Sequence, residues 1–380
     1  MKRYKIAIVS DSYLPKVGGL EVHMHDLAHE LTLQGHEAHI ICVTPGGPDR
    51  EIFPVHRIAA PLLPRIGYIR NGQSIPVLEE LLRSGGYDVV HSHCIFSPLG
   101  HAAAYLAKKL QLPSVFTLHS VLRGVGGVAL RALDHLYPWS AQPTIWTGVS
   151  SFVADELRAV TGRRDVQILL NATRTEEWRL PRREEQRVVS VLRFARRKRP
   201  MDLIRMVPQV LRQLPRDKWP IFTLVGDGPE RARVEREVAR LGLAAHVEFT
   251  GILPRPQVQK LLARSAVFAL PSYLEALPIA IIEARAAGLP VVARTPNGVA
   301  EIIEHGEHGY LAADTGEFVK YLVRLLVSPE LRLRMSAKAQ LDLERFTWAR
   351  SIERHVQIYA QALQRLGTHQ PEAAHYAQAA

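Results

Sequence analysis

Short apolar segments alternate with longer amphipathic segments along nearly the whole chain. Apolar runs such as Ser114–Leu118 and Ile221–Val225 predict β-strands that are buried on both faces. Between such runs, apolar residues recur at helical spacing, as in residues 20–34, and Gly35 then provides a helix stop. Strands and helices that alternate in this way predict parallel sheets covered by helices on both faces.

The alternation breaks once and then restarts, which predicts two successive α/β domains. Residues 171–187 are polar and charged, so we interpret them as an interdomain linker. In doubly wound sheets of this kind, ligands bind at the carboxyl ends of the strands. The expected parts are an N-terminal domain (1–170), the linker (171–187), a C-terminal domain (188–346), a long final helix (347–366) and a mobile tail (367–380).

Charge and composition narrow the expected partners and location. The net charge is +11, and the residues after position 170 carry +9 of it, which suits an anionic ligand or an anionic membrane surface. Nucleic acid is not the expected partner, because no helix-turn-helix, zinc or aromatic stacking pattern is present. No apolar run approaches the roughly 20 residues that span a bilayer. The first apolar run predicts a strand and not a signal peptide, and the two cysteines, Cys42 and Cys94, predict buried free thiols in a cytoplasmic protein.

Two glycine-containing turns each lead from a strand into a helix. Gly18 and Gly19 allow close backbone approach to a bulky anion at a helix N-terminus, although an ordinary turn explains them equally simply. The turn from Gly226 to Pro229 combines glycine backbone freedom with a proline at helix entry, and a purely structural role is the favoured interpretation there.

A basic cluster follows a predicted strand in the second domain. It consists of Arg193, Arg196, Arg197, Lys198 and Arg199. Arginine forks and lysine charges at a strand end suit a diphosphate, and they would stabilise it as a leaving group. The alternative is a solvated surface turn.

Two glutamates eight positions apart, Glu275 and Glu283, lie in a loop and in the helix that follows it. Glu283 is surrounded in sequence by apolar residues, and a buried carboxylate needs a partner. Sugar hydroxyls or a ribose diol would serve, and so would a buried ion pair with Arg285 or Arg294.

Histidines gather at predicted strand ends in the first domain. His119 closes one strand, and His91 and His93 flank the end of another. A metal site would require a third or fourth converging ligand, which the sequence does not show, so we expect no metal.

Together these motifs resemble glycosyltransferase family 4, whose members have the GT-B fold, from Ile6 to about Leu363. The matching pieces are residues 12–15 with Gly18 and Gly19, residues 91–93, residues 117–119, Arg193 with Lys198, residues 226–229, and the pair Glu275 and Glu283. The resemblance implies two Rossmann-like doubly wound parallel-sheet domains facing across a cleft, with the C-terminal helix returning to the N-terminal domain.

The resemblance also implies roles for individual residues. Arg193 and Lys198 would clamp the donor diphosphate opposite Gly19, Glu275 would hold the transferred sugar and Glu283 the ribose. The implied donor-binding residues are Gly18, Gly19, Arg193, Lys198, Gly226, Glu275, Ala276, Leu277, Pro278 and Glu283; the implied catalytic residues are His119, Arg193, Lys198 and Glu275; and the implied acceptor-side residues are His91, His93, Ser120 and Arg123.

The sequence departs from the family pattern at several positions while keeping the implied catalytic set. Leu192 and Arg199 stand where glycines commonly flank the arginine and lysine. Leu277 and Pro278 replace phenylalanine and glycine, residues 171–174 replace Asn-Gly-Val-Asp, and residues 297–298 replace a glycine pair.

The implied reaction is retaining, metal-independent transfer of a hexose or N-acetylhexosamine from a UDP- or GDP-sugar, without a cofactor. Residues 91–120 resemble transferases that act on phosphatidylinositol and related acceptors. We expect a cytoplasmic monomer or homodimer, peripheral at the inner face of the membrane.

The sequence leaves open the roles of two segments and two alternative functions. Residues 53–70 could skim an anionic membrane, or form a partly buried loop of the domain, and residues 123–127 predict the start of a mobile acceptor-side loop. The rivals are a sugar-nucleotide epimerase or phosphorylase on the same fold, and a non-catalytic module that binds a nucleotide sugar.

Overall fold

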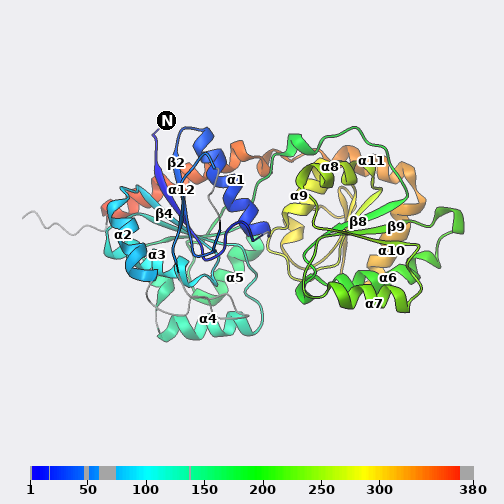
Figure 1. The fold of residues 1–380 in the computed structure, drawn as a ribbon, viewed down its shortest axis with the longest axis horizontal. Helices are drawn as coiled ribbons and strands as arrows, with labels where there is room; N and C mark the ends of the chain where they lie inside the picture. Colours follow the sequence, from blue (N-terminus) through cyan, green and yellow to red (C-terminus); the bar gives the residue numbers. More distant parts are fainter. Residues whose placement is uncertain (1, 17, 47–50, 60–73, 137, 369–380) are drawn as a thin grey trace, which may run out of the picture. The chain divides into compact units, whose positions relative to one another are not determined.

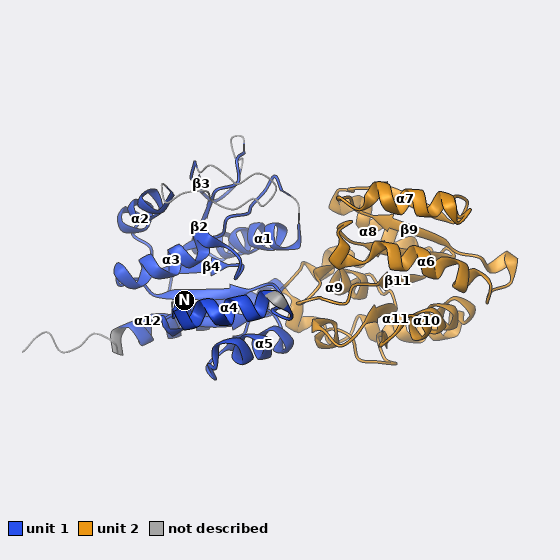
Figure 2. Cartoon of the chain, turned by 90° about the horizontal axis from the view of Figure 1, so that it is seen from below, with its two compact units in different colours: residues 1–171, 348–380 blue, residues 172–347 orange. Residues whose placement is uncertain are grey.

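The computed structural model describes residues 2–16, 18–46, 51–59, 74–136 and 138–368. The chain forms two compact units (Figure 2): Met1–Asn171 together with Trp348–Ala380, and Ala172–Thr347.

The first unit is built on a parallel sheet of seven strands in the order β3-β2-β1-β4-β5-β6-β7. Because β1 pairs with β2 on one side and with β4 on the other, the topological switch point lies between β1 and β4. The strands are β1 (Lys5–Val9), β2 (Glu37–Cys42), β3 (Val55–Arg57), β4 (Val89–His93), β5 (Ser114–Leu118), β6 (Ile145–Gly148) and β7 (Gln167–Ile168). Its helices are α1 (Gly19–Leu33), α2 (Ser74–Ser84), α3 (Pro98–Lys109), α4 (Val125–Leu136), α5 (Ser151–Thr161) and α12 (Trp348–Thr368).

The second unit repeats this design with six parallel strands in the order β10-β9-β8-β11-β12-β13, so its switch point lies between β8 and β11. Figure 1 shows helices on both sides of this sheet. The strands are β8 (Arg187–Val191), β9 (Ile221–Val225), β10 (Val247–Gly251), β11 (Val267–Leu270), β12 (Val291–Arg294) and β13 (Gly309–Ala312). The helices are α6 (Pro200–Leu211), α7 (Arg231–Arg240), α8 (Arg255–Arg264), α9 (Ile279–Ala286), α10 (Thr315–Val327) and α11 (Pro329–Ala339).

Continuous apolar strands form the centre of each sheet. Every residue of β4, β5 and β11 is buried, as expected for strands covered on both faces. The predicted doubly wound α/β fold in two domains is therefore confirmed.

The C-terminal helix belongs to the first unit. α12 packs against α1, β4 and β5, and its Tyr359 side chain is completely buried there. This confirms the expectation that the final helix returns to the N-terminal domain. Of the predicted mobile tail (367–380), residues 367 and 368 belong to α12 and the rest lies outside the described residues.

The segment interpreted as a linker packs into the second unit from Ala172 onward. The side chain of Trp178 is 1% exposed, and the N–H of Thr173 donates to the carbonyl of Phe346 at 3.0 Å. Asn171, Thr173 and Thr175 are buried as well, so the polar sequence of the segment does not mean that it is exposed.

Candidate functional site

The strongest cluster of predicted site residues lies at the switch point of the second unit. β8 and β11 are neighbours in the sheet, and the segments that follow them, residues 192–199 and 271–278, meet beyond their carboxyl ends. Ligands of doubly wound sheets bind at this position because the loops diverge there.

Lys198 and Glu275 form an ion pair across these two segments. The ammonium of Lys198 lies 2.7 Å from each carboxylate oxygen of Glu275, and the two side chains are 19% and 5% exposed, respectively. Both charges are thus largely shielded from water and hold each other in place. The two residues are 77 positions apart in the sequence, and only the resemblance to the family had assigned them to one site. The structure places them in direct contact.

Neighbouring residues fix the backbone on both sides of this pair. The hydroxyl of Ser272 donates to the carbonyl of Lys198 at 3.2 Å, and the N–H of Gly298 donates to the carbonyl of Glu275 at 2.8 Å. A Cβ at Gly298 would collide with the carbonyl of Ala276, so only glycine fits there. Sequence reasoning assigned no role to Ser272, whose only signal is its place in the loop after a strand.

The Gly226 turn forms the adjacent wall of the site. Gly226 has φ 126°, and a Cβ on it would collide with the carbonyl of Leu192. The N–H of Phe194 donates to the carbonyl of Asp227 at 2.9 Å. These contacts explain the glycine by close backbone packing, in agreement with the favoured structural interpretation; donor contact by Gly226 stays a prediction.

The basic cluster divides between different environments. Arg193 is exposed and makes no ion pair with another described residue, whereas Lys198 is bound to Glu275. Arg199 takes the left-handed conformation (φ 55°, ψ 41°) at the N-cap of α6. This conformation costs a non-glycine residue about 1 kcal/mol, which explains why the family pattern has glycine at this position.

The helix α9 carries the rest of the second-unit motif. Pro278 is its N-cap residue, Ala276 and Leu277 lie immediately before it, and Glu283 is partly exposed on it. The guanidinium of Arg285 donates to three backbone carbonyls, those of Ile302, Leu341 and Ala339, at 2.6, 2.9 and 3.1 Å. Three of its five N–H donors are therefore directed at backbone carbonyls.

In the first unit, the N-cap residue Gly18 and the first residue of α1, Gly19, differ. Around Gly19 an added Cβ would meet no atom within 4 Å, so this backbone faces open space. Gly18 instead lies against the carboxylate of Glu21, which also accepts a 2.5 Å hydrogen bond from Ser12. Gly19 is thus the better placed of the two for contact with an anion.

The predicted histidines lie together at the ends of β4 and β5. A ring nitrogen of His93 lies 2.9 Å from one of His119, while His91 is completely buried and bonded to Tyr359 and Thr117 at 2.9 and 2.7 Å. His91 therefore has both ring nitrogens engaged inside the core, which leaves neither for direct contact with an acceptor.

The expected acceptor-side loop is a helix. Arg123 and Gly124 lie in a turn, and α4 begins directly at Val125. A Cβ at Gly127 would collide with the carbonyl of Leu122, so the glycine reflects close packing and not mobility. Arg123 is itself held by Glu156 at 2.7 Å, and Ser120 lies in the turn before it.

Comparison with known proteins decides the family. The model for glycosyltransferase family 4 matches residues 17–177, and the model for glycosyl transferases group 1 matches residues 173–342. The chain belongs to glycosyltransferase family 4.

Relatives of this family 4 chain include proteins with different acceptors. One human relative, from the phosphatidylinositol N-acetylglucosaminyltransferase, is 27% identical over 80% of this chain, which spans 64% of the human protein's length. The N-acetyl-alpha-D-glucosaminyl L-malate synthase of Bacillus anthracis is 26% identical, covering 92% of this chain and 95% of that protein. A solved structure of Anabaena HepE in complex with UDP and glucose has a TM-score of 0.76 and 19% identity, covering 96% of this chain and 100% of the other.

Two further features of this family 4 member concern metal binding and membrane-spanning helices. Within the described residues, no group of three or more His, Cys, Asp or Glu side chains is arranged to hold a metal ion. None of the helices in the described part of the chain is long and apolar enough to cross a membrane.

Buried histidines make the first unit sensitive to acid. Burial lowers the pKa of His23, His91 and His93 well below 6.5, that of His119 to about 3 and that of His355 to about 4. Above pH 6.5 these groups are neutral in both folded and unfolded states. Between pH 6.5 and about 4, only the unfolded chain takes up their protons, so stability is lost as pH falls.

We expect the free energy of unfolding of the first unit to fall by about 1.4 kcal/mol per pH unit for each such histidine. The measurement is urea unfolding followed by tryptophan fluorescence from pH 7 to pH 4. His355→Gln should reduce the dependence of the unfolding free energy on pH by the contribution of about one proton. Replacement of the exposed His135 with glutamine serves as the control. An unchanged slope in His355→Gln would contradict this explanation.

Proposed function

We propose that the chain is a retaining glycosyltransferase that moves a hexose or N-acetylhexosamine from a UDP- or GDP-sugar to a hydroxyl group of its acceptor. The observation that carries this proposal is the shielded Lys198–Glu275 pair at the switch point of the second unit. The relatives that act on a lipid and on a small molecule support the reaction class.

The pair supplies two complementary functions. Glu275 offers two carboxylate oxygens, which accept hydrogen bonds from the hydroxyls of a bound sugar. Lys198 offers up to three N–H donors, and with Arg193 it would stabilise the negative charge that develops on the departing diphosphate. Backbone N–H groups at the start of α9 add to the same positive field.

In the proposed reaction, the acceptor hydroxyl attacks the anomeric carbon on the face from which the diphosphate departs. The bond from the anomeric carbon to the phosphate oxygen breaks, the new glycosidic bond forms, and the hydroxyl proton passes to the departing diphosphate. The Glu275 and Glu283 pair is therefore not an acid and nucleophile pair of the glycosidase type. His119, held by His93, would lie near the sugar and the acceptor.

A donor assay tests the reaction class. Incubation with UDP- or GDP-sugars should release nucleoside diphosphate and consume donor only when an acceptor-containing lipid or small-molecule fraction is present, with product mass increased by one sugar. Conversion of donor alone into an isomeric nucleotide sugar would instead support the epimerase alternative.

We further propose that the enzyme acts at the inner face of a membrane, on a lipid or lipid-like acceptor with an inositol-type hydroxyl, with glycans or small molecules as the alternatives. The described part of the segment expected to skim the membrane does not support that role, because Phe53 and Ile58 are 5% and 4% exposed and Val55–Arg57 forms β3. Residues 60–70, the rest of the segment that was expected to contact the membrane, lie outside the described residues.

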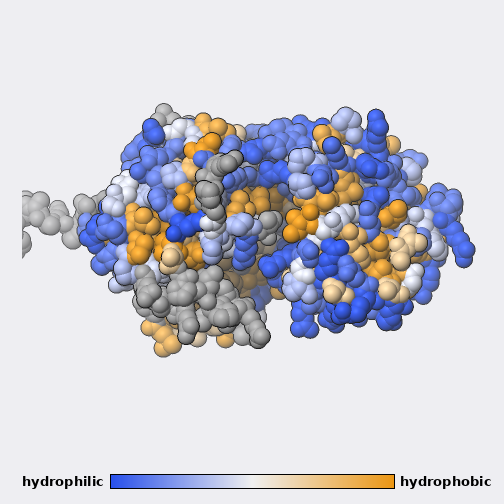
Figure 3. Space-filling model, viewed as in Figure 1, coloured by the Kyte–Doolittle hydropathy of each residue, from blue (hydrophilic) through white to orange (hydrophobic). Residues whose placement is uncertain are grey.

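The outer face of α4 is the better candidate for membrane contact. Val128, Leu133 and Leu136 are 71%, 49% and 83% exposed, and Arg131 is exposed beside them. At the lower edge of the first unit, where Figure 1 places α4, Figure 3 shows a few apolar side chains. The carboxylate of Asp134 accepts hydrogen bonds from the N–H and the hydroxyl of Ser140 at 2.8 and 2.7 Å, so it is directed at Ser140. An apolar helical stripe that also carries an arginine suits an anionic lipid surface.

Vesicle flotation checks this assignment. The protein should float with vesicles of phosphatidylcholine and phosphatidylglycerol, and Leu133→Gln with Leu136→Gln should reduce the bound fraction about tenfold. Leu333→Gln with Leu341→Gln, which removes comparably exposed leucines from the second unit, should bind as wild type does. Wild-type protein that stays wholly in the unbound fraction would contradict membrane contact.

A further inference from the structure

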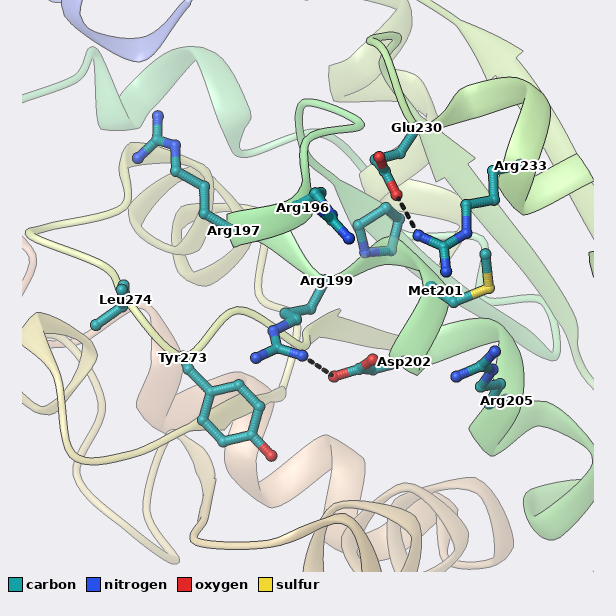
Figure 4. Close-up of a pocket in the computed structure, with 11 residues that line it drawn as sticks. Arg196, Arg197, Arg199, Met201, Asp202, Arg205, Glu230, Arg233, Tyr273 and Leu274 are labelled. Atoms are coloured by element: carbon teal, nitrogen blue, oxygen red, sulfur yellow. Dashed lines mark hydrogen bonds and ion pairs between the residues drawn. The ribbon is translucent and has the colours of Figure 1, made fainter. Parts of the chain in front are cut away.

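The second unit contains a hollow beside the Lys198–Glu275 pair that no proposed donor contact uses. Its volume is about 500 Å³, and it lies between the start of α6, the start of α7 and the loop after β11 (Figure 4). The lining residues are Arg196, Arg197, Arg199, Pro200, Met201, Asp202, Arg205, Glu230, Arg233, Tyr273 and Leu274.

The lining of the hollow is strongly basic. Five arginines line it against two acidic residues, Asp202 and Glu230. These carboxylates contact Arg199 at 3.7 Å and Arg233 at 3.2 Å, while Arg196 makes no ion pair with another described residue. Figure 4 shows Arg197 pointing away and the other four arginines arranged around the hollow. A concave surface lined mainly by one sign of charge concentrates ions of the opposite sign.

The aromatic wall of the hollow is held between two guanidinium groups. The Tyr273 ring lies 5.3 Å from the guanidinium carbon of Arg199 and 4.8 Å from that of Arg294. Arg294 is completely buried, and two of its nitrogens have no hydrogen-bond partner among the described residues. The positive charge behind the wall adds to that of the lining.

Arg199 gives a second reason to assign a ligand to this hollow. Its left-handed backbone favours glycine, yet the chain carries an arginine whose guanidinium extends to the rim. Strained residues persist where they serve a site, and here the strain places one more cation at the hollow.

The hollow is distinct from the donor-side pair, although the same two segments form both. Lys198 bonds to Glu275, whereas the next residue, Arg199, stacks on Tyr273. None of Arg193, Lys198, Glu275 or Glu283 lines the hollow. Adjacent side chains thus serve two separate sites.

We propose that this hollow is a second anion site, which binds the phosphate group of a phosphorylated polyol or sugar. Guanidinium groups donate pairs of hydrogen bonds that match phosphate oxygens, and arginines from three separate segments surround the space. The volume exceeds that of phosphate alone and leaves room for the polyol that carries it. The phosphate could come from a free phosphomonoester or from the phosphodiester headgroup of a lipid, and the site does not depend on which reaction the donor side performs.

Calorimetric titration of the full chain with glycerol 3-phosphate tests the proposal, with saturating UDP present to occupy the donor side. The pocket variant is Arg205→Gln with Arg233→Gln. The control is Arg212→Gln with Arg236→Gln, which removes the same charge at exposed positions outside the hollow, one at the C-cap of α6 and one on α7. Arg199→Gly provides a third variant that removes a rim cation without backbone strain.

We expect the pocket variant to weaken binding about tenfold or more and Arg199→Gly to weaken it in the same direction, while the control binds as wild type does. A parallel titration with glycerophosphoinositol distinguishes the sources, since tighter binding of this diester would identify a lipid headgroup. No binding of either compound, or equal weakening in pocket and control variants, would overturn the proposal. Repeating the comparison without UDP separates this result from any failure of the donor assignment.

Discussion

Replacing Lys198 with alanine should lower kcat/KM for sugar transfer about 100- to 1,000-fold, because removal of one preorganised charge that stabilises a transition state typically has an effect of this size. The main loss should be in kcat, since the charge on the diphosphate grows as the sugar departs. Steady-state kinetics with the identified donor and acceptor provide the measurement.

Loss of folding must be separated from loss of catalysis in that experiment. Lys198→Ala leaves the carboxylate of Glu275, only 5% exposed, without its ion-pair partner. Thermal unfolding should therefore be measured for Lys198→Ala and for Lys198→Ala with Glu275→Gln, which removes the unpaired charge. Lys218→Ala, at an exposed position of the same unit, is the control for charge. Full transfer activity in folded Lys198→Ala would contradict the proposed role.

Replacing Arg285 with leucine should destabilise the second unit by about 3–5 kcal/mol. The guanidinium is completely buried, and it holds the carbonyl of Ile302 and, at the end of α11, the carbonyls of Ala339 and Leu341. Leucine would leave the buried carbonyls of Ile302 and Ala339 without donors, each at a cost of about 1–3 kcal/mol before relaxation, whereas the carbonyl of Leu341, a residue that is 63% exposed, can bond to water. Burial lowers the pKa of Arg285 to about 10, so the group still carries its charge at neutral pH.

Urea unfolding of Arg285→Leu and of Arg264→Leu measures this effect. Arg264 is 58% exposed and pairs with Glu185 on the surface, so its replacement should cost less than about 1 kcal/mol. If both variants unfold at the same urea concentration, the carbonyl contacts of Arg285 do not stabilise the unit as described.

The sheets were largely predictable because their central strands are buried on both faces and read as continuous apolar runs. Ser114–Leu118 and Ile221–Val225 match the predicted strands residue for residue. The strand Val55–Arg57 was not predicted, because it is only three residues long and partly exposed throughout. The helix α4 was predicted as a loop, because the glycines at its start resemble a flexible segment when the packing of Gly127 against Leu122 is unknown.

The candidate site was predictable as a set of residues but not as a set of contacts. The family motif marks Lys198 and Glu275, yet only the pairing of β8 with β11 brings them within 2.7 Å. His91 and His93 lie two positions apart on β4 and are both completely buried, yet His91 bonds to Tyr359 and Thr117 whereas His93 contacts His119. These partners come from α12 and from the end of β5, and no spacing along the chain encodes them.

The central claim is that the Lys198 side of the second unit binds a nucleotide-sugar donor. Calorimetric titration of UDP and GDP into wild type, Lys198→Ala and Lys218→Ala tests it most directly, without any knowledge of the acceptor. We predict that one of the two nucleotides binds wild type and Lys218→Ala with equal affinity. The same nucleotide should bind Lys198→Ala with an affinity lower by about tenfold or more. Failure of both nucleotides to bind the folded wild-type protein, or equal affinity for wild type and Lys198→Ala, would contradict it.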